Sequence, residues 1–328
     1  MTIPTAAPGR PAIGLDIGGT KIAGGLVDPS GRVLAQAKRD TPAQDPPAIA
    51  LESAALVREL AAAAPGGVVA GVGVACAGFV DRTGSTVLFA PNLAWRDEPL
   101  KERLEVLLDL PVVIENDANA AAWGEFRFGA ARDVDDMVLV TVGTGVGGGA
   151  VVDSGLLRGA FGIGGELGHM RVVPDGRRCG CGNKGCWEQY ASGNALVREA
   201  RELVTAHSPH AAALAELCGD DPAALRGVHI TQAARQGDPA AIELLADLGT
   251  WLGEGIASVG AILDPGLVVV GGGVAEAGEL LLGPTREAFL RNLIGRGHRP
   301  TPELELAQLG NDAGMIGVAD LALTASLR

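Results

Sequence analysis

The stretch IGLDIGGTK, residues 13–21, constrains the fold most, because an apolar run with one acidic residue leads into two glycines and a hydroxyl residue. The pattern predicts a strand over 13–17, a glycine turn, and a second strand over 22–27. Asp-Pro-Ser-Gly at 28–31 is typical of a further turn, and a third strand is expected from residue 33. The chain is therefore expected to begin with three strands joined by two tight turns.

The same order of features recurs later in the chain. An apolar run over 138–142 is followed by Gly143-Thr144-Gly145, a second apolar run over 146–152 and an Asp-Ser-Gly turn at 153–155. In both copies the aspartate of the second turn follows the first glycine by ten residues. The repeat indicates an internal duplication, and we predict two similar α/β lobes, each offering a glycine turn to one phosphorylated ligand.

The rest of the sequence alternates between strand and helix patterns, which is typical of layered α/β domains. The C-terminal part is mostly helical, and Asp238-Pro239 is a good start for a long helix. Further strands are predicted at 68–76, 111–115 and 267–270, and helices at 47–64, 99–108, 117–128, from 239 to before Pro265, and 312–325.

The composition is that of a folded, acidic chain. Its 328 residues include 26 Lys and Arg against 39 Asp and Glu, a formal net charge of −13, which argues against a nucleic-acid partner. The uncharged stretch 60–80 is broken by Pro65, Gly66 and Gly67, which argues against a membrane span. Because the N-terminus shows no signal-peptide pattern, we expect a cytoplasmic protein with reduced cysteines.

Two common nucleotide-binding patterns are excluded. No Gly-Lys dipeptide occurs, which rules out a P-loop, and residues 149–152 predict a strand where a Rossmann loop must open a helix. Asp16-Ile17-Gly18-Gly19-Thr20-Lys21 instead suits magnesium phosphate, because glycine N–H groups can approach the oxygens, Thr20 adds a donor and Asp16 holds magnesium through water. The alternative is an ordinary Gly-Gly hairpin turn.

A polar pair follows the strand predicted at 111–115. Within Glu115-Asn116-Asp117-Ala118-Asn119-Ala120, Asp117 is the candidate general base that takes a proton from a sugar hydroxyl during phosphoryl transfer. Asn116 would fix the geometry of that hydroxyl. The alternative is that Asp117 only caps the following helix, and the two roles are compatible.

The segment GGELGHMRVVPDGRRCGCGNKGCWE, residues 164–188, carries a metal-binding pattern. Cys179, Cys181 and Cys186 fall within eight positions, and His169 lies ten residues before the first of them. A Cys₃His set suits structural zinc, and the alternative is three reduced cysteines in a loop. Zinc would lock one ring nitrogen of His169 and turn the other toward a substrate. Glu166 and Glu188 would accept hydrogen bonds from hydroxyls there, although Glu188 taken alone is typical of a solvated loop.

Three motifs together resemble the ROK family (repressor, open reading frame, kinase), and most closely its bacterial ATP-dependent glucokinases. They are the 16–21 stretch, Gly143-Thr144-Gly145-Val146-Gly147-Gly148-Gly149, and the C-x-C-G-x-x-G-C-x-E string at 179–188. The resemblance covers residue 13 to the C-terminus. It implies a two-lobed actin-like, hexokinase-type ATPase fold (ribonuclease H-like) that closes on sugar and ATP.

The resemblance also implies the domain boundaries. A flexible tail is expected at 1–11, and a smaller N-terminal α/β domain at 12–127 plus 312–328, to which the last helix returns. The larger C-terminal domain, with the zinc loop and most helices, is expected at 128–311.

The resemblance further assigns roles to single residues. Asp117 matches the catalytic base and Asn116 its sugar-binding neighbour. The other sugar-side matches are Gly78, Asn92, Glu166, His169 and Glu188, and His169 also joins Cys179, Cys181 and Cys186 at zinc. The candidates for nucleotide binding, with Mg²⁺ accompanying ATP, are Asp16, Gly18, Gly19, Thr20, Lys21, Gly143, Thr144, Gly145, Gly271 and Gly272.

The leading hypothesis is transfer of a phosphoryl group from ATP to the 6-hydroxyl of glucose, giving glucose 6-phosphate and ADP. ROK kinases for N-acetylmannosamine or fructose share the cysteine string and stay open as alternatives, as does a non-catalytic sugar sensor, which an intact Asp117 disfavours. A ROK repressor would need a helix-turn-helix domain ahead of residue 13 and a more basic chain. Polyphosphate-using glucokinases lack the cysteine string. The family suggests a homodimer or homotetramer.

Overall fold

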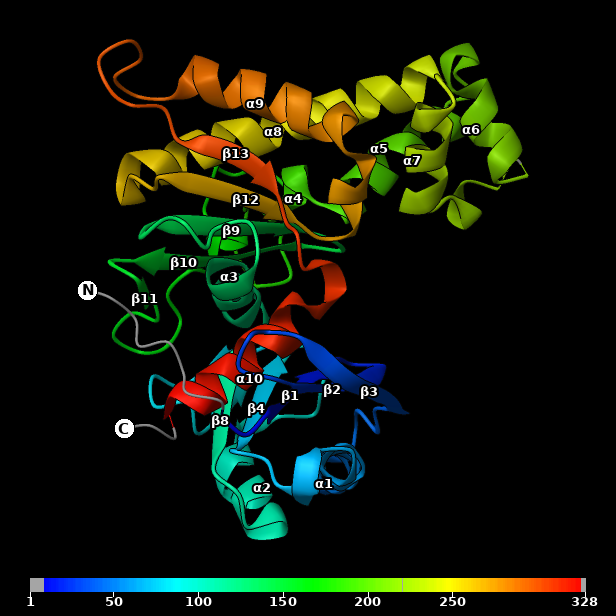
Figure 1. Cartoon of the computed structure of the whole chain (residues 1–328). Helices are drawn as coiled ribbons and strands as arrows, with labels where there is room; N and C mark the ends of the chain where they lie inside the picture. The colour runs from blue at the N-terminus through cyan, green and yellow to red at the C-terminus, as the bar shows by residue number, and fades with distance from the viewer. Residues whose placement is uncertain (1–8, 220, 326–328) are drawn as a thin grey trace. The chain divides into compact units, whose positions relative to one another are not determined.

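Strand β1 (Ala12–Ile17) lies in the middle of a five-stranded sheet in the computed structural model, which describes residues 9–219 and 221–325 (Figure 1). The order of this sheet is β3-β2-β1-β4-β8. The strands β2 (Lys21–Val27) and β3 (Val33–Asp40) are antiparallel to their neighbours, whereas β4 (Val72–Cys76) and β8 (Val112–Asn116) continue the sheet in parallel. Residues 1–8 of the predicted tail and 326–328 of the predicted N-terminal domain lie outside the described residues.

A second five-stranded sheet repeats this order as β11-β10-β9-β12-β13. Its strands are β9 (Met137–Val142), β10 (Val146–Val152), β11 (Gly155–Leu156), β12 (Leu267–Gly271) and β13 (Glu303–Leu306). β10 and β11 are antiparallel, whereas β12 is parallel to both β9 and β13. The matching order, with a glycine turn after the first strand of each copy, confirms the predicted duplication.

The described residues form two compact units. The first unit comprises 9–133, 149–165 and 308–325, and the second comprises 134–148 and 166–307 without residue 220. The predicted domain boundaries stay a prediction. The compact units assign residues 128–133, 149–165 and 308–311 to the first unit, and the prediction had placed them in the C-terminal domain.

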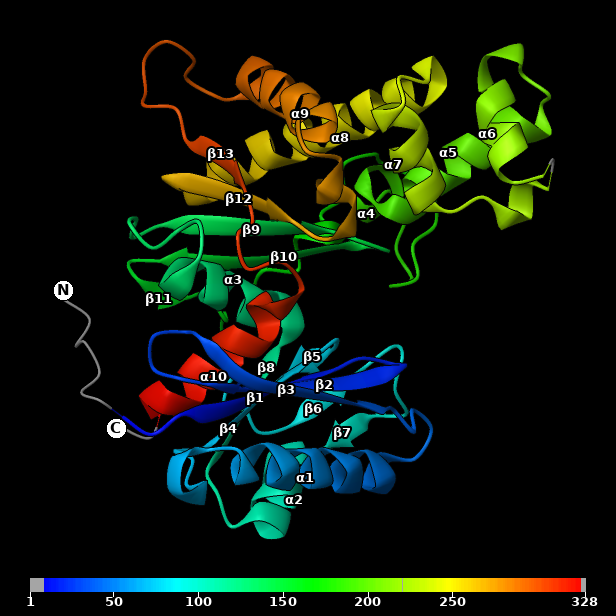
Figure 2. The same cartoon turned by 45° about the vertical axis from the view of Figure 1, so that its right-hand side comes forward.

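Helices cover both faces of the first sheet (Figures 1 and 2). α1 (Pro46–Ala62) and α2 (Leu100–Leu108) lie on one face, and α10 (Ala313–Ala325) lies on the other, packed against α3 (Asp117–Phe128). Glycine is required under α10, because a Cβ added at Gly14 or Gly73 would lie 1.9 Å from a carbonyl oxygen of that helix. The last helix therefore belongs to the first unit, as the resemblance implied.

The second unit is richer in helices. They are α4 (Glu188–Ala191), α5 (Gly193–Thr205), α6 (Ala212–Leu217), α7 (Gly227–Arg235), α8 (Pro239–Leu263) and α9 (Glu279–Asn292). Asp238 caps α8 and Pro239 occupies its first turn, as predicted. Among the residues that the structure describes, no helix combines the length and the apolar composition needed to cross a bilayer.

Short 3₁₀ turns and one small sheet complete the fold. The 3₁₀ turns are η1 (Pro65–Gly67), η2 (Leu167–His169), η3 (Pro209–Ala211), η4 (Pro222–Ala224), η5 (Gly273–Ala277) and η6 (Gly310–Asp312). The strand predicted at 68–76 begins only at Val72, because residues 68–71 form the connection between η1 and β4. The small sheet β5 (Phe79–Val80), β6 (Val87–Phe89) and β7 (Arg96–Glu98) was not predicted, since strands of two or three residues carry little periodicity.

Candidate active site

The carboxyl ends of three parallel strands carry the polar residues of the first unit. β1, β4 and β8 are in register, so that Ile17, Cys76 and Asn116 are neighbours across the sheet. Asp16 lies one residue before this row and Asp117 one residue after it. Ligand sites in open α/β sheets gather at this edge. The structure therefore brings the two predicted aspartates to one place.

Asn116, rather than Asp117, caps α3. The Asn116 side chain accepts a hydrogen bond from the Asn119 N–H at 3.0 Å and donates one to the Gly78 carbonyl at 3.1 Å. The Asp117 carboxylate accepts a hydrogen bond from the Ala118 N–H at 2.9 Å. Asn116 therefore holds the N-cap position, while Asp117 accepts a first-turn N–H of the same helix. The predicted sugar-side Gly78 lies next to Asn116.

Burial controls the acidity of both aspartates. It raises the pKa of Asp117 above its usual range. Burial and then the nearby Asp117 charge raise the pKa of Asp16 to about 6, although Lys21 acts in the opposite direction. A pKa closer to neutrality makes a carboxylate a better proton acceptor for a hydroxyl. Two like charges at one edge also favour a cation between them.

The first glycine turn is a hairpin between β1 and β2. Its backbone geometry is therefore that of the Gly-Gly hairpin named above as the alternative to a phosphate-binding turn. The Gly18 N–H donates to the Lys21 carbonyl at 3.0 Å, and the Thr41 hydroxyl donates to the Gly18 carbonyl at 2.8 Å. A Cβ added at Gly19 would lie 3.0 Å from the Cβ of Asn92, so this predicted sugar-side residue lies against the turn. Thr20 and Lys21 are exposed there. A hairpin with exposed donors remains compatible with phosphate binding.

His169, Cys179, Cys181 and Cys186 come together in the second unit. Their ligand atoms all lie within 4.8 Å of one another. The Cys179 Sγ is 3.7 Å from the His169 Nδ1, and the Sγ atoms of Cys181 and Cys186 are 3.6 Å apart. Tetrahedral zinc, with Zn–S of about 2.3 Å and Zn–N of about 2.0 Å, separates its ligand atoms by about 3.5 to 3.8 Å. The cluster therefore has the donors and the spacing to bind zinc.

The orientation of the His169 ring leaves one nitrogen for another partner. Its Nδ1 faces the sulfur atoms, so its Nε2 is the nitrogen directed away from them. Glu166 directly precedes η2, and its carbonyl accepts the His169 N–H at 3.1 Å. Gly168 between them packs on Val146, where an added Cβ would lie 2.0 Å from the carbonyl oxygen. Glu166 and His169 are thus held on one short turn.

Glu188 links the cysteine cluster to the second glycine turn. One carboxylate oxygen accepts the Val146 N–H at 3.2 Å, and the other is 3.8 Å from the Cys179 Sγ. A Cβ added at Gly145 would lie 2.1 Å from that first oxygen. The alternative reading of Glu188 as a solvated loop residue is therefore wrong. Glu188 can face a ligand held by either feature.

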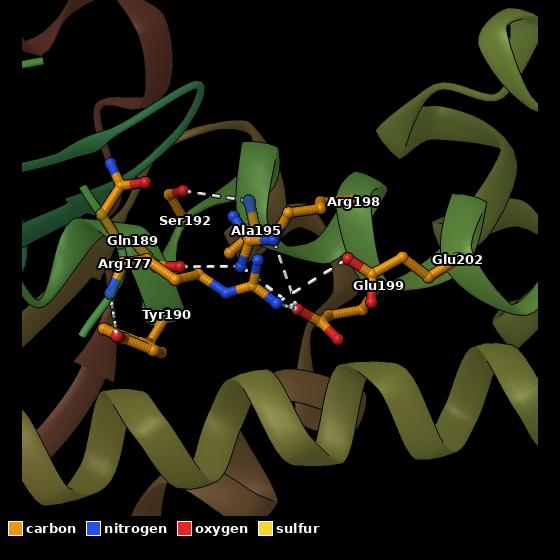
Figure 3. A network of polar contacts seen from close by, with 8 residues as sticks. All are labelled: Arg177, Gln189, Tyr190, Ser192, Ala195, Arg198, Glu199 and Glu202. Atoms are coloured by element: carbon orange, nitrogen blue, oxygen red, sulfur yellow. Dashed lines mark hydrogen bonds and ion pairs between the residues drawn. The ribbon is translucent and has the colours of Figure 1, made fainter. Parts of the chain in front are cut away.

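The base of the cysteine loop is fastened to α5, as Figure 3 shows. The Arg177 N–H donates to the Tyr190 hydroxyl at 2.7 Å, and its guanidinium lies 3.3 Å from the Glu199 carboxylate. Arg198 donates to the Gln189 carbonyl at 2.8 Å and pairs with the same Glu199 carboxylate at 3.1 Å. These contacts hold α4, whose first residue is Glu188, against the cysteine loop and α5.

The second glycine turn lies against the start of α5. The Gly193 N–H donates to the Gly143 carbonyl at 2.8 Å, and the next N–H donates to the Thr144 carbonyl at 3.3 Å. Gly272 has φ +87°, and an added Cβ there would lie 2.5 Å from a carbonyl oxygen of β9. Only glycine fits at this position, because both the backbone angle and the space exclude a side chain.

A cavity of about 850 Å³ opens beside this turn, entirely within the second unit. Of the glycine-turn residues predicted to bind nucleotide, Gly143 and Thr144 line this cavity, whereas Gly145 and Gly272 do not, and Gly271 is buried at the end of β12. Sequence reasoning missed its other walls, since α7 carries no nucleotide motif. Those walls include Asn194, Arg226, Thr231, Gln232, Arg235 and Val274.

The predicted site residues fall into two groups, one in each unit. The first unit holds Asp16, Gly18, Gly19, Thr20, Lys21, Gly78, Asn92, Asn116 and Asp117. The second unit holds Gly143, Thr144, Gly145, Glu166, His169, Cys179, Cys181, Cys186, Glu188, Gly271 and Gly272. Each group alone has a recognisable chemistry: two half-buried aspartates with raised pKa values in the first, and a Cys₃His cluster that could hold a metal, with a cavity nearby, in the second.

The chain is similar to known proteins along most of its length. The family model described as "ROK family" matches residues 12–325. The glucokinase of Streptomyces coelicolor is 48% identical over 315 residues, which cover 94% of this chain and 96% of that protein. The N-acetylmannosamine kinase of Escherichia fergusonii is 38% identical over 314 residues, covering 94% of this chain and 97% of that protein.

A solved structure also resembles the chain along nearly its whole length. It is a ROK family glucokinase from Streptomyces griseus in complex with glucose and AMPPNP, 50% identical, with a TM-score of 0.86 and coverage of 96% of this chain and 99% of that chain. The fold is thus the actin-like, hexokinase-type ATPase fold that the resemblance implied.

Proposed function

The chain belongs to the ROK family, and from this premise we propose that it transfers the terminal phosphoryl group of ATP to the 6-hydroxyl of glucose. The products are glucose 6-phosphate and ADP. The observation that carries the proposal is the position of Asp117, a half-buried carboxylate at the carboxyl edge of the first sheet that does not occupy the N-cap of α3 and has a raised pKa. The similarity to glucokinases, including one bound to glucose and AMPPNP, supports the choice of substrates.

In the proposed reaction Asp117 accepts the proton of the sugar 6-hydroxyl. The oxygen then bonds to the terminal phosphorus as the bond from that phosphorus to the ADP oxygen breaks. Asn116 is already hydrogen-bonded on both sides, so it can hold the hydroxyl in one orientation. Glu166, His169 through Nε2, and Glu188 are proposed to bind the remaining hydroxyls, with Gly78 and Asn92 beside them.

The nucleotide is proposed to bind the two glycine turns and the cavity of the second unit. Gly18, Gly19 and Thr20, and in the second unit Thr144 with its neighbouring N–H groups, would meet phosphate oxygens. Arg226 and Arg235 in the cavity wall suit the anionic part or the ribose. Magnesium bound with ATP supplies positive charge to the phosphates, and Asp16 would hold it through water.

The cysteine cluster is proposed to hold structural zinc. Zinc would fix the His169 ring, while a closed set of four protein ligands leaves no position for the reaction itself. The residues that would hold it are His169, Cys179, Cys181 and Cys186.

The test is a coupled ADP assay with glucose, mannose, fructose and N-acetylmannosamine at equal concentrations. We expect glucose to give the highest kcat/KM, and Asp117→Asn to lower kcat by about 10² to 10⁴. Asp109→Asn, which changes an exposed aspartate at the end of α2, is the matched control and should keep full activity. ADP formation independent of any hexose, or full activity of Asp117→Asn, would refute the proposal. Preference for N-acetylmannosamine would favour the alternative substrate.

A further inference from the structure

The residue directly before the Asn116-Asp117 pair is a buried carboxylate. Glu115 is only 3% exposed, and each of its two oxygens has partners. Its Oε1 accepts the Asn116 backbone N–H at 3.1 Å and the Asn119 side-chain amide at 3.1 Å. Its Oε2 pairs with the Arg158 Nε at 2.6 Å. One carboxylate thus holds the end of β8, the first turn of α3 and a distant arginine.

The arginine comes from a segment that is itself fixed within the first unit. Arg158 follows β11, and its carbonyl accepts the Gly164 N–H at 2.9 Å, which closes the loop 158–164 on itself. Gly162 in this loop packs on the carbonyl of Val80, where an added Cβ would lie 2.2 Å away. Arg158 is therefore presented to Glu115 from an ordered loop.

The two hydrogen bonds that the Glu115 Oε1 accepts set the orientation of the peptide that carries Asp117. The same oxygen bridges the strand end and the helix start, on either side of that peptide. A buried carboxylate keeps such an orientation only while its charge is compensated, and among the described residues Arg158 is the cation paired with it. Loss of Arg158 would release Glu115 toward water and free the strand-to-helix junction.

We propose that Glu115 and Arg158 are positioning residues for the base Asp117, through the ion pair that fixes the junction of β8 and α3. This inference rests on the proposed function. Neither residue needs to touch the sugar or the nucleotide. The competing explanation is that the pair only stabilises the fold.

A second ion pair in the same unit offers a matched control. Arg103 Nε lies 2.7 Å from the Glu98 Oε1, and the Glu98 side chain is 9% exposed. The arginine side chains are similarly accessible, 37% exposed for Arg103 and 33% for Arg158. Arg103 lies on α2, on the face of the first sheet opposite α10, and it is not among the residues placed in the active site. Breaking either pair should therefore cost similar stability.

The experiment compares Arg158→Met, Arg158→Lys and Arg103→Met with the unchanged protein, measuring kcat, KM for glucose, KM for ATP and thermal stability. We expect Arg158→Met to lower kcat about 10- to 100-fold, since small misplacement of a reacting group has effects of this size. KM for ATP should stay unchanged, because the proposed cavity lies in the second unit. Arg158→Lys keeps the charge and should recover part of kcat. Arg103→Met should lose stability but keep kcat.

Full kcat in Arg158→Met, or an equal loss of kcat in Arg103→Met, would overturn the positioning role while leaving the proposed function intact. If Arg158→Met does not fold, Arg158→Gln, which removes the charge but keeps a polar side chain, decides, and a kcat equal to that of the unchanged protein then overturns the role. An unchanged protein without hexose-dependent ADP formation would refute the proposed function and the positioning role with it.

Discussion

At the scale of single residues, the site holds two carboxylates in an environment that disfavours their charged form. Asp16 and Asp117 are both half-buried at the carboxyl edge of the first sheet, and each has a raised pKa. Such a local conflict is characteristic of a functional site, where binding a cation or a proton relieves it.

Asp16 gives this conflict a measurable pH dependence in protein free of metal and nucleotide. Its pKa rises from 3.8 to about 6 on folding, so the folded state binds more protons between these values. Its contribution to stability is therefore complete below about pH 4 and is lost as the pH rises through about 6. We expect Asp16→Asn to be more stable than the unchanged protein at pH 7.5, by roughly 2 to 3 kcal/mol, with the difference vanishing near pH 4.

Denaturant unfolding in EDTA at pH 4.5, 6 and 7.5 would measure the difference. A difference that does not change with pH would contradict it. Activity should fall in the same variant, because Asp16 is proposed to hold magnesium through water.

Gly145 gives a second prediction at this scale. An added Cβ would lie 2.1 Å from the Glu188 Oε2, so Gly145→Ala must push this carboxylate from the Val146 N–H. We expect kcat/KM for glucose to fall about 10- to 100-fold, because a displaced ligand loses its orientation. Gly266→Ala is the control, since its nearest neighbour is 3.6 Å away, at ordinary contact distance. Equal kinetics of the two variants would argue against a sugar role for Glu188.

At the scale of elements, the cysteine loop is the part least supported by regular structure. Within the described chain, residues 170–187 hold two isolated β-bridges, Arg171 with Cys186 and Arg178 with Lys184, and no helix. Side-chain ligands to a metal would therefore supply much of the order of this loop. The loop also ends at Glu188, so disorder in it would reach the proposed sugar ligands.

Removal of one ligand tests this dependence. Cys181 is the exposed ligand of the cluster, so Cys181→Ser changes the metal site with little effect on the core. We expect zinc to fall from about one per chain to well below one, and KM for glucose to rise at least about tenfold as His169 is released. Cys218→Ser, outside the cluster, is the control and should keep both values. Zinc well below one per chain in unchanged, unchelated protein would refute the zinc assignment.

Elements with a local signal were predictable, and those made by tertiary packing were not. The glycine pairs and the Asp-Pro start of α8 are local, so they were predicted from single stretches. The sequence offers Asp117 as the cap of α3, whereas the cap is Asn116. Both are good capping residues, and the choice between them depends on the exact residue at which β8 ends. The α7 wall of the cavity has no local signature, since packing against α5 and α8 places it.

At the scale of the whole molecule, net charge works against the proposed anionic substrate. The chain carries a formal charge of −13, which disfavours the approach of ATP through long-range repulsion. Local positive charge must offset this, and the cavity of the second unit contains Arg226 and Arg235 beside the acidic Glu276. Besides the glycine turn, three separate segments of the sequence, 193–197, 226–236 and 273–276, line this cavity, which explains why motif reading found only the glycine turn.

This arrangement predicts where each substrate will slow hydrogen exchange along the chain. Mg-AMPPNP should protect peptides covering 193–197, 226–236 and 273–277, because these segments border the cavity and a bound ligand suppresses local opening. Glucose alone should instead protect peptides around 115–119, where Asn116 and Asp117 lie. The helices α1 and α2, on the opposite face of the first sheet from α10, serve as an internal control and should not respond directly. Protection of 226–236 by glucose alone, or none there with Mg-AMPPNP, would show that the cavity is not the nucleotide site.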